Sequence, residues 1–145
     1  MKVKQISVFL ENKSGRLAGI TKTLGLHHIN IRALSIADTT DFGILRLIVG
    51  EPEEAVRRLK AEGYTVSETD VIAVEIPDKP GGLSEIMQYL DTVKINIEYM
   101  YAFVGKSNDK AVVVFRVEDV EGAISLLQQK GVSLLNAAQI YSLNT

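Results

Sequence analysis

Two short polar segments hold the residue types best suited to binding a small charged molecule. Asn12-Lys13-Ser14-Gly15 and Asp78-Lys79-Pro80-Gly81 each follow a segment with strand character and precede an amphipathic segment. A glycine lets the backbone approach a ligand, and the free N–H groups in the first turn of a helix attract an anion such as a carboxylate. Asparagine and aspartate are also common N-caps, and glycine is a common turn residue. The sequence therefore leaves open an anion-binding loop and an ordinary helix cap.

An asparagine between two isoleucines is a second repeated feature. Ile29-Asn30-Ile31 recurs as Ile95-Asn96-Ile97, each time at the start of a segment with strand character. Asparagine is disfavoured in strands. Its occurrence in both places, together with the same type of loop, suggests a polar side chain with a binding role. A turn that leads into the strand is the other interpretation.

Residues for catalysis or metal binding are scarce. The chain has no cysteine, and it contains neither the elbow motif of serine hydrolases nor a Walker loop. Its two histidines, His27 and His28, are adjacent and so do not share a helix face, which makes them a poor chelating pair; we expect them at the solvated end of a helix. The acidic residues suggest no acid/base pair. We therefore expect no catalytic residue, no metal site and no cofactor.

Composition narrows the class of protein further. Of the 145 residues 46% are apolar, enough for a packed core, and the net charge of −2 argues against a nucleic-acid or anionic-membrane surface. The segments 44–49 and 111–117 lack the alternating aromatics that stack RNA bases, apart from Phe115. No apolar run is long enough to cross a bilayer, and the N-terminus does not resemble a secretory signal. Together with the absence of cysteine, this favours a cytoplasmic location.

An internal repeat organises the chain. Residues 11–17 align with residues 77–83, and residues 29–31 with residues 95–97, both at a shift of 66. Residues 45–47 align with residues 113–115, and Gly63 with Gly131, at a shift of 68. The second copy should therefore carry two extra residues, which we expect in a hairpin at 105–109 that corresponds to 38–41. The repeat predicts two domains, residues 1–70 and 71–145, with a boundary near Thr69-Asp70 and no flexible linker.

Each copy has the pattern strand, helix, strand, strand, helix, strand. Pro52 suits the first turn of a helix, and Gly63 and Gly131 suit its left-handed end. We predict an α+β fold of two ferredoxin-like βαββαβ domains side by side, with antiparallel sheets and helices on one face. In the first copy the predicted strands are 6–10, 29–36, 44–49 and 64–68, and the helices bury Leu17, Ile20, Leu24 and Ala55, Val56, Leu59. In the second copy the strands are 71–76, 95–103, 111–117 and 138–143, and the helices bury Leu83, Ile86, Met87, Leu90 and Ala123, Ile124, Leu127.

The order of loop, glycine, leucine, helix and Ile-Asn-Ile resembles the ACT domain, once per copy and over essentially the whole chain. ACT domains are regulatory modules that commonly pair through their second strands and bind effector amino acids at that seam. The resemblance, together with the exposed edges of the strands, implies that segments 29–36 and 95–103 pair edge to edge. It implies one site formed by Asn12, Lys13, Ser14, Gly15, Arg16 and Leu17 with Asn96. It implies a second site formed by Asp78, Lys79, Pro80, Gly81, Gly82 and Leu83 with Asn30.

These features predict an amino-acid-binding regulatory protein with no catalysis of its own. The expected partners are a free amino acid, a second copy in a homodimer, and an enzyme or regulator of amino-acid metabolism. A protein–protein interaction module with the same fold and no small-molecule ligand is the alternative. An enzyme on this frame is the third possibility and has the least support, since no nucleophile or base pair is evident.

Overall fold

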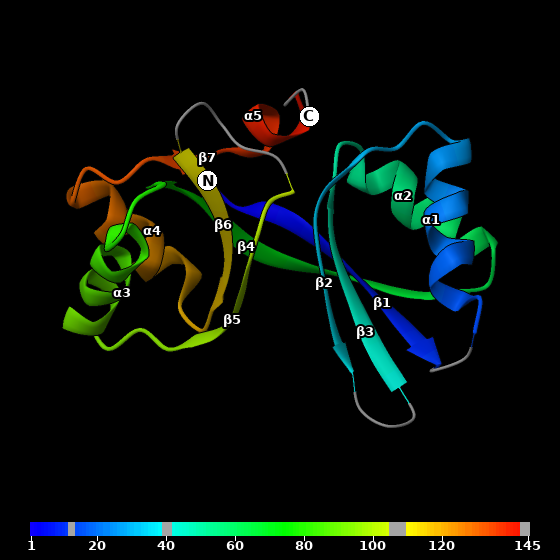
Figure 1. Cartoon of the computed structure of the whole chain (residues 1–145), viewed down its shortest axis with the longest axis horizontal. Coiled ribbons are helices and arrows are strands. Elements are labelled where there is room, and N and C mark those ends of the chain that lie inside the picture. Colours follow the sequence, from blue (N-terminus) through cyan, green and yellow to red (C-terminus); the bar gives the residue numbers. More distant parts are fainter. Residues whose placement is uncertain (12–13, 39–41, 105–109, 143–145) are drawn as a thin grey trace. The chain divides into compact units, whose positions relative to one another are not determined.

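A computed structural model describes residues 1–11, 14–38, 42–104 and 110–142 (Figure 1). They divide into two compact units. We call Lys4–Thr69 the first domain, and Asp70–Thr145 with Met1–Val3 the second domain. The long strand β4 (Thr65–Pro77) begins in the first domain and continues in the second, so a strand and not a flexible linker connects them.

The first domain has the predicted order of elements. Its strands lie in the order β2-β3-β1-β4, and β3 is antiparallel to both β1 and β2. Both helices lie on one face of this sheet (Figure 1). The elements are β1 (Val3–Glu11), α1 (Arg16–Leu26), β2 (Ile31–Asp38), β3 (Phe42–Val49), α2 (Pro52–Ala61) and the start of β4.

Alternation along the strands builds the first core. In β1 the side chains of Ile6, Val8 and Leu10 are buried, while Phe9 between them is exposed. Period-2 alternation of this kind sends one set of side chains to the helices and the other set to the opposite face. The helices contribute Ile20, Leu24, Ala55 and Leu59 to this core, and the strands add Leu45, Leu47 and Val49.

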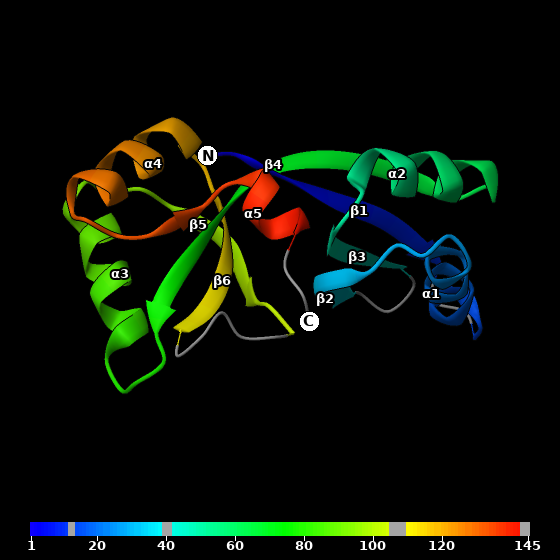
Figure 2. The ribbon, with the colours of Figure 1, turned by 90° about the horizontal axis from the view of Figure 1, so that it is seen from above.

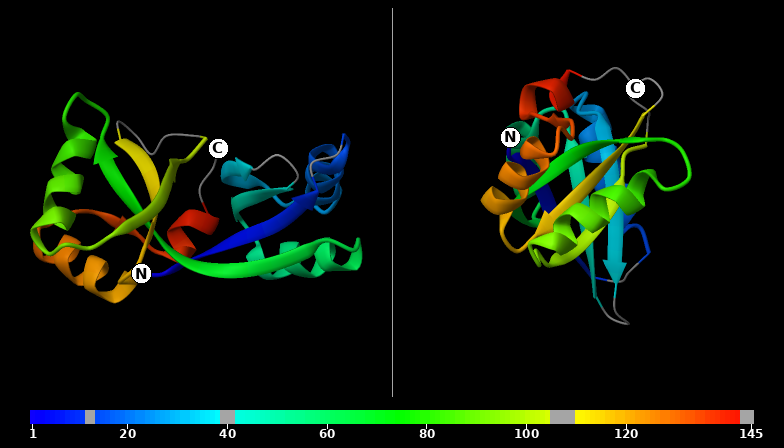
Figure 3. Two further views of the ribbon diagram at one scale, coloured as in Figure 1. Left: turned by 90° about the horizontal axis from the view of Figure 1, so that it is seen from below. Right: turned by 90° about the vertical axis from the view of Figure 1, so that its left-hand side faces the viewer.

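The second domain repeats this arrangement. Its strand order is β5-β6-β4, with β7 paired to the other side of β4. Helices α3 and α4 lie on one face of the sheet, and the short α5 lies on the opposite face (Figures 2 and 3). The elements are α3 (Gly82–Thr92), β5 (Ile97–Ala102), β6 (Lys110–Val117), α4 (Val120–Gln129), β7 (Leu134–Leu135) and α5 (Ala137–Tyr141).

Strand register confirms the repeat residue by residue. Ile31 pairs with Val49 next to an irregularity in β2, and Ile97 pairs with Val117 next to an irregularity at the same place in β5. The shift is 66 from Ile31 to Ile97 and 68 from Val49 to Val117. The two extra residues therefore lie between the second and third strands of the second copy, as predicted. Residues 39–41 and 105–109 of these connections lie outside the described part of the chain.

The prediction of a closing strand at residues 138–143 was wrong. Two-residue β7 closes the second sheet, and the chain then turns into α5. Asn136 begins this helix with a capping box: its side chain accepts from the Gln139 N–H, and the Gln139 side chain accepts from the Asn136 N–H, both at 2.8 Å. This reciprocal pair stabilises a helical turn and overrides the weak alternation that suggested a strand.

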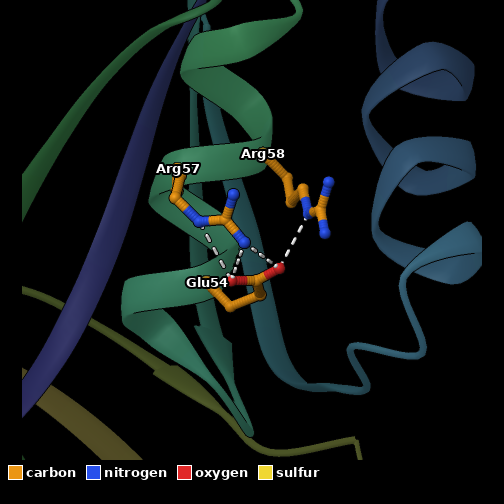
Figure 4. Close-up of polar contacts among 3 residues, drawn as sticks. All are labelled: Glu54, Arg57 and Arg58. Carbon is orange, nitrogen blue, oxygen red and sulfur yellow. Dashed lines mark hydrogen bonds and ion pairs between the residues drawn. The ribbon is translucent and has the colours of Figure 1, made fainter.

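The predicted start and end of helix α2 in the first domain are confirmed. Pro52 lies in the first turn of α2, and Gly63 ends the turn after it with a φ of 90°. The exposed side of α2 carries a charged cluster in which Glu54 accepts hydrogen bonds from Arg57 and Arg58, the shortest being 2.6 Å and 2.7 Å (Figure 4). The bonds from Arg57, and secondly the one from Arg58, lower the pKa of Glu54 from its ordinary value.

Candidate functional site

Both candidate loops end in a glycine that begins a helix. Gly15 is the N-cap of α1 with a φ of 89°, and Gly81 is the N-cap of α3 with a φ of 88°. Because both N-cap residues are glycines, neither forms a side-chain capping hydrogen bond. In the second loop the Gly82 N–H donates to the Lys79 carbonyl at 3.1 Å, so the loop backbone itself bonds one N–H of that helix start. Asn12 and Lys13 lie outside the described residues.

The two loops differ at the first helical residue. Gly82 is buried, and a Cβ placed on it would lie 2.2 Å from the carbonyl oxygen of Pro77. In the first domain the corresponding residue is Arg16, whose side chain is about half exposed and lies 3.8 Å from Glu11. The second loop therefore packs its helix start against the preceding strand, while the first presents a guanidinium group there.

Other predicted site residues are exposed. Ser14, Asp78, Lys79 and Pro80 lie on the surface of their turns. Leu17 and Leu83, expected in the core, are instead 38% and 37% exposed. A leucine exposed at the same position of both helices leaves an apolar side chain beside each loop.

The two repeated asparagines lie just before their strands. Asn30 precedes β2, and its carbonyl accepts a hydrogen bond from the Gly50 N–H at 3.1 Å. Asn96 precedes β5, and its carbonyl accepts from the Glu118 N–H, also at 3.1 Å. Both residues are exposed. The backbone carbonyl of each asparagine thus anchors the start of a strand.

Within one domain, the loop and the asparagine lie at opposite ends of the sheet. Glu11, at the loop end of β1, pairs with Phe42, whereas Ile31, next to Asn30, pairs with Val49 at the other end of β3. The second domain has the same arrangement: Pro77 pairs with Lys110, and Ile97 with Val117. A site that uses both a loop and an asparagine therefore requires two domains.

A pair of pockets beside the loops was missed by sequence reasoning. The pocket of the first domain has a volume of about 310 Å³, and that of the second about 200 Å³. The sequence signal that could have indicated the first pocket was Phe9 and Phe42. Both are apolar residues at solvent-facing positions of strands that otherwise alternate regularly. The first pocket is lined by Phe9, Leu10, Glu11, Arg16, Phe42, Gly63, Tyr64 and Thr65.

Polar groups in the second pocket bind one another. Ser133 Oγ donates to Glu75 Oε1 at 2.6 Å, and Tyr89 Oη donates to Glu85 Oε1 at 2.7 Å. Lys130 Nζ lies 5.7 Å from the centroid of the Tyr89 ring. The hydrogen bond to Glu85 raises the pKa of the Tyr89 hydroxyl above its ordinary value, because ionisation would place a phenolate beside a carboxylate.

Neither a metal-binding cluster nor a membrane-spanning helix occurs among the described residues. Within the ranges given above, no group of three His, Cys, Asp or Glu residues is placed to hold a metal ion. None of the helices in that part of the chain has the length and apolar character needed to cross a membrane.

Comparison with known proteins identifies the family. The family model described as an ACT domain pair matches residues 1–143. Protein BT0572 from Bacteroides thetaiotaomicron is 43% identical, with a TM-score of 0.93 over 99% of this chain and 98% of that one. The ligand-free regulatory subunit of aspartate kinase from Thermus thermophilus shares the fold at 18% identity, with a TM-score of 0.62 over 87% of this chain and 91% of that one. Comparison with curated protein sequences gives no match. With the loops, the repeated register and the family match in agreement, the chain belongs to the ACT domain pair family.

Proposed function

We propose that the protein senses a free amino acid and transmits its binding to an enzyme or regulator of amino-acid metabolism, with no catalysis of its own. The observation that carries this proposal is the repeated helix start. Gly15 and Gly81 are left-handed N-caps, and neither has a side chain that could cap its helix. Such a helix start presents backbone N–H groups and the positive end of the helix dipole to a ligand carboxylate. In α3 the Gly82 N–H already bonds the Lys79 carbonyl, which is one reason to expect tighter binding at the first loop.

The proposed site combines the loop of one domain with the asparagine of another. Loop and asparagine lie at opposite ends of each sheet, and β2 and β5 are each paired on one side within their own domain, to β3 and β6. An antiparallel pairing of two second strands would bring the start of one beside the end of the other. Within this chain the prediction that β2 pairs with β5 was wrong, because the two strands lie at opposite ends of the strand order. The same pairing between two copies of a homodimer would form the seam.

We expect the first loop to bind more tightly than the second. Residues 12–17 with Asn96 form the first proposed site, and residues 78–83 with Asn30 form the second. An asparagine amide can donate to a carboxylate and accept from an ammonium group. Asp78 in the second loop would repel the ligand carboxylate, whereas the first loop has the neutral Asn12 at that position and adds Arg16.

Thermal unfolding in the presence of each of the twenty amino acids tests the proposal. A ligand at a hundred times its dissociation constant should stabilise the protein by about 2.7 kcal/mol and raise its melting temperature by several degrees. No response to any amino acid would contradict amino-acid sensing. It would favour the alternative, an interaction module whose partner is another protein.

Calorimetry on two matched variants then tests the site. If Asn96 contacts a charged group of the ligand in a buried seam, Asn96→Ala should weaken binding by roughly 1.5–3 kcal/mol. Asn30→Ala is the matched control, because it removes the same side chain from the site that we expect to be weaker. Parental affinity in both variants would show that the asparagines only anchor the starts of their strands.

A further inference from the structure

We propose that the sheet face of the first domain that lies opposite its helices docks the same face of a second copy of this chain. Ile44 pairs with Phe9 on one side and with Ala37 on the other, so these three side chains share a face. It is the face opposite α1 and α2, because Val8 and Leu10, on either side of Phe9, point into the core between sheet and helices. We call it the open face; its exposed or half-buried residues are Ser7, Phe9, Ala37, Phe42, Ile44, Thr65 and Ser67.

Apolar side chains lie next to one another on the open face. Phe9 and Phe42 are each about half exposed, Ile44 is 37% exposed, and the two phenylalanine ring centroids lie 5.2 Å apart. The charged residues on this side of β1 and β3, Glu11 and Arg46, lie at its border. An interface core is depleted of charged residues, enriched in aromatic ones and surrounded by a polar rim, and a contiguous exposed apolar patch marks an interaction surface. The open face thus has the composition of a docking surface.

The second domain shows that the fold does not require such a surface. At the repeat shifts of 66 and 68, the residues that correspond to Phe9, Phe42 and Ile44 are Glu75, Lys110 and Val112. Charged residues thus replace the aromatic pair, and Val112 is only 2% exposed. The short helix α5 lies on this face of the second sheet (Figures 2 and 3), whereas both helices of the first domain lie on the other face of theirs (Figure 1). The first domain therefore has an aromatic pair and no helix of its own where the second domain has charges and α5.

A hollow of about 200 Å³ adjoins the aromatic pair on the open face, and it is lined by Ser7, Phe9, Ile44, Thr65 and Ser67. Sites for small molecules are typically larger, with volumes of about 300–1,000 Å³. This hollow therefore suits one side chain of a protein partner. Phe42 lies outside it, with its ring next to that of Phe9. The open face thus carries both an exposed ring and a hollow beside that ring.

These two features make the open face complementary to itself. A two-fold axis brings the same surface of two copies together, and such an axis would place Phe42 of each copy at the hollow of the other. The uncharged centre of the face opposes no like charges when it meets its own copy. Twisted sheets pack face to face about 10 Å apart with interdigitating side chains. A second copy of this chain therefore fits the open face.

The size of the open face sets the strength of this contact. A standard protein–protein interface has about 20–30 residues on each side, whereas the open face has the seven named above. We expect a weak, reversible dimer with a dissociation constant roughly in the micromolar to millimolar range. The contact is independent of the seam, because the seam uses the edges of β2 and β5 and this contact uses the face of the first sheet.

Paramagnetic broadening between two differently labelled copies of the full-length chain tests the proposal by NMR. The chain has no cysteine, so Ser67→Cys provides a single attachment site for a spin label at the rim of the hollow. The spin-labelled protein is mixed with the ¹⁵N-labelled parent chain. We expect the strongest broadening at the backbone amides of Ser7, Phe9 and Ile44 of the parent chain. The broadening should decrease on dilution and disappear when the spin label is reduced.

Two charge variants test the same contact, with affinity measured from the concentration dependence of the broadening. Phe9→Glu and Phe42→Lys introduce the residues of the second domain at exposed positions, so the fold should tolerate them. Each variant, present in both copies, should weaken association at least about tenfold, because it places an unpaired charge in the contact. A mixture of the two variants should associate more tightly than either alone, because the new lysine of one copy would lie beside the new glutamate of the other.

Leu34→Lys is the matched control. Leu34 is 39% exposed, but it lies on the helix side of the first sheet, since it pairs with the buried core residue Leu47. This variant should leave the broadening at the open face unchanged, although it alters the β2 edge on which the seam depends.

Three outcomes would overturn the proposal. The first is an absence of broadening at Ser7, Phe9 and Ile44 in the mixture with the parent chain. The second is association of both charge variants as tight as that of the parent. The third is broadening that is strongest on β5 and is lost in Leu34→Lys, which would assign the contact to the seam. Amino-acid sensing is tested separately, since the thermal response of Phe9→Glu to amino acids should equal that of the parent.

Discussion

Gly82 is the residue at which one added methyl group should have the clearest effect. It is the first residue of α3, and it is buried against the end of β4. A Cβ on Gly82 would lie 2.2 Å from the Pro77 carbonyl oxygen and 3.1 Å from Ile76 Cγ2. Because Cβ atoms essentially never approach another atom within 3.0 Å, Gly82→Ala requires the helix start and the strand end to separate by at least 0.8 Å.

The cost follows from the nature of the clashing atom. A carbonyl oxygen of the backbone cannot rotate away, so the displacement has to involve the chain between Pro77 and Gly82. Overpacking of this kind typically costs about 1–3 kcal/mol. The better helix propensity of alanine offsets up to about 1 kcal/mol of that cost. We expect a net loss of roughly 1–2 kcal/mol and a fall in melting temperature of several degrees.

Thermal unfolding followed by circular dichroism measures this loss, with two matched controls. Gly25→Ala, in α1, adds a methyl group that meets no atom within 4 Å apart from its chain neighbours and the backbone of its own helix. It should stabilise the protein by roughly 0.5–1 kcal/mol. Arg16 is the residue of the first domain that corresponds to Gly82 of the second. Arg16→Ala should change stability by less than about 0.5 kcal/mol, because the Arg16 side chain is half exposed. If Gly82→Ala were as stable as the parent, the close packing of α3 on β4 would be refuted.

Three further predictions concern local features of the two domains. His28 has a left-handed φ of 58°, which is strained for a residue with a side chain, so His28→Gly should stabilise the protein by about 1 kcal/mol in thermal unfolding. The control His27→Gly, at a φ of −100°, should not stabilise it. A lower stability of His28→Gly than of the parent would refute the idea of backbone strain at His28. Asn136→Ala removes the capping box of α5 and should cost about 1 kcal/mol, seen as faster hydrogen exchange in α5 while exchange in α4 is unchanged; unchanged exchange in α5 would show that the cap is unimportant. The depressed pKa of Glu54 means that its bonds stabilise the folded state above the ordinary pKa of 4.5 and are lost as the pH falls through the folded value. Glu54→Gln should therefore be less stable than the parent at neutral pH and equal to it in acid, and a difference that persists in acid would contradict this assignment.

The sequence did not predict the fold and the site equally well. Alternation in the strands and the spacing of Ile20 and Leu24 predicted the core of the first domain, because burial of one face dictates both patterns. The same rule placed Leu17 in the core, where the structure leaves it 38% exposed. Periodicity identifies a face of a helix, but it does not say how much of that face other elements cover.

The sequence by itself determined the repeat, the order of elements, and the glycines at the two helix starts. These are local properties: Gly15 and Gly81 adopt a φ near +89° because only glycine does so at little cost. The sequence pattern did not predict α5, because the capping bonds between Asn136 and Gln139 compete with a weak strand pattern.

Only the tertiary structure decided which residues, distant in the sequence, line the same pocket. The first pocket joins Phe9, Phe42 and Tyr64 from three separate segments, and their proximity depends on strand register and on the return of the chain after α2. The tertiary structure also placed each asparagine and its own loop at opposite ends of one sheet, because the first and second strands both pair antiparallel to the third. Sequence spacing carries no information on such pairings, since they are set by hydrogen bonds between segments that the chain itself keeps far apart.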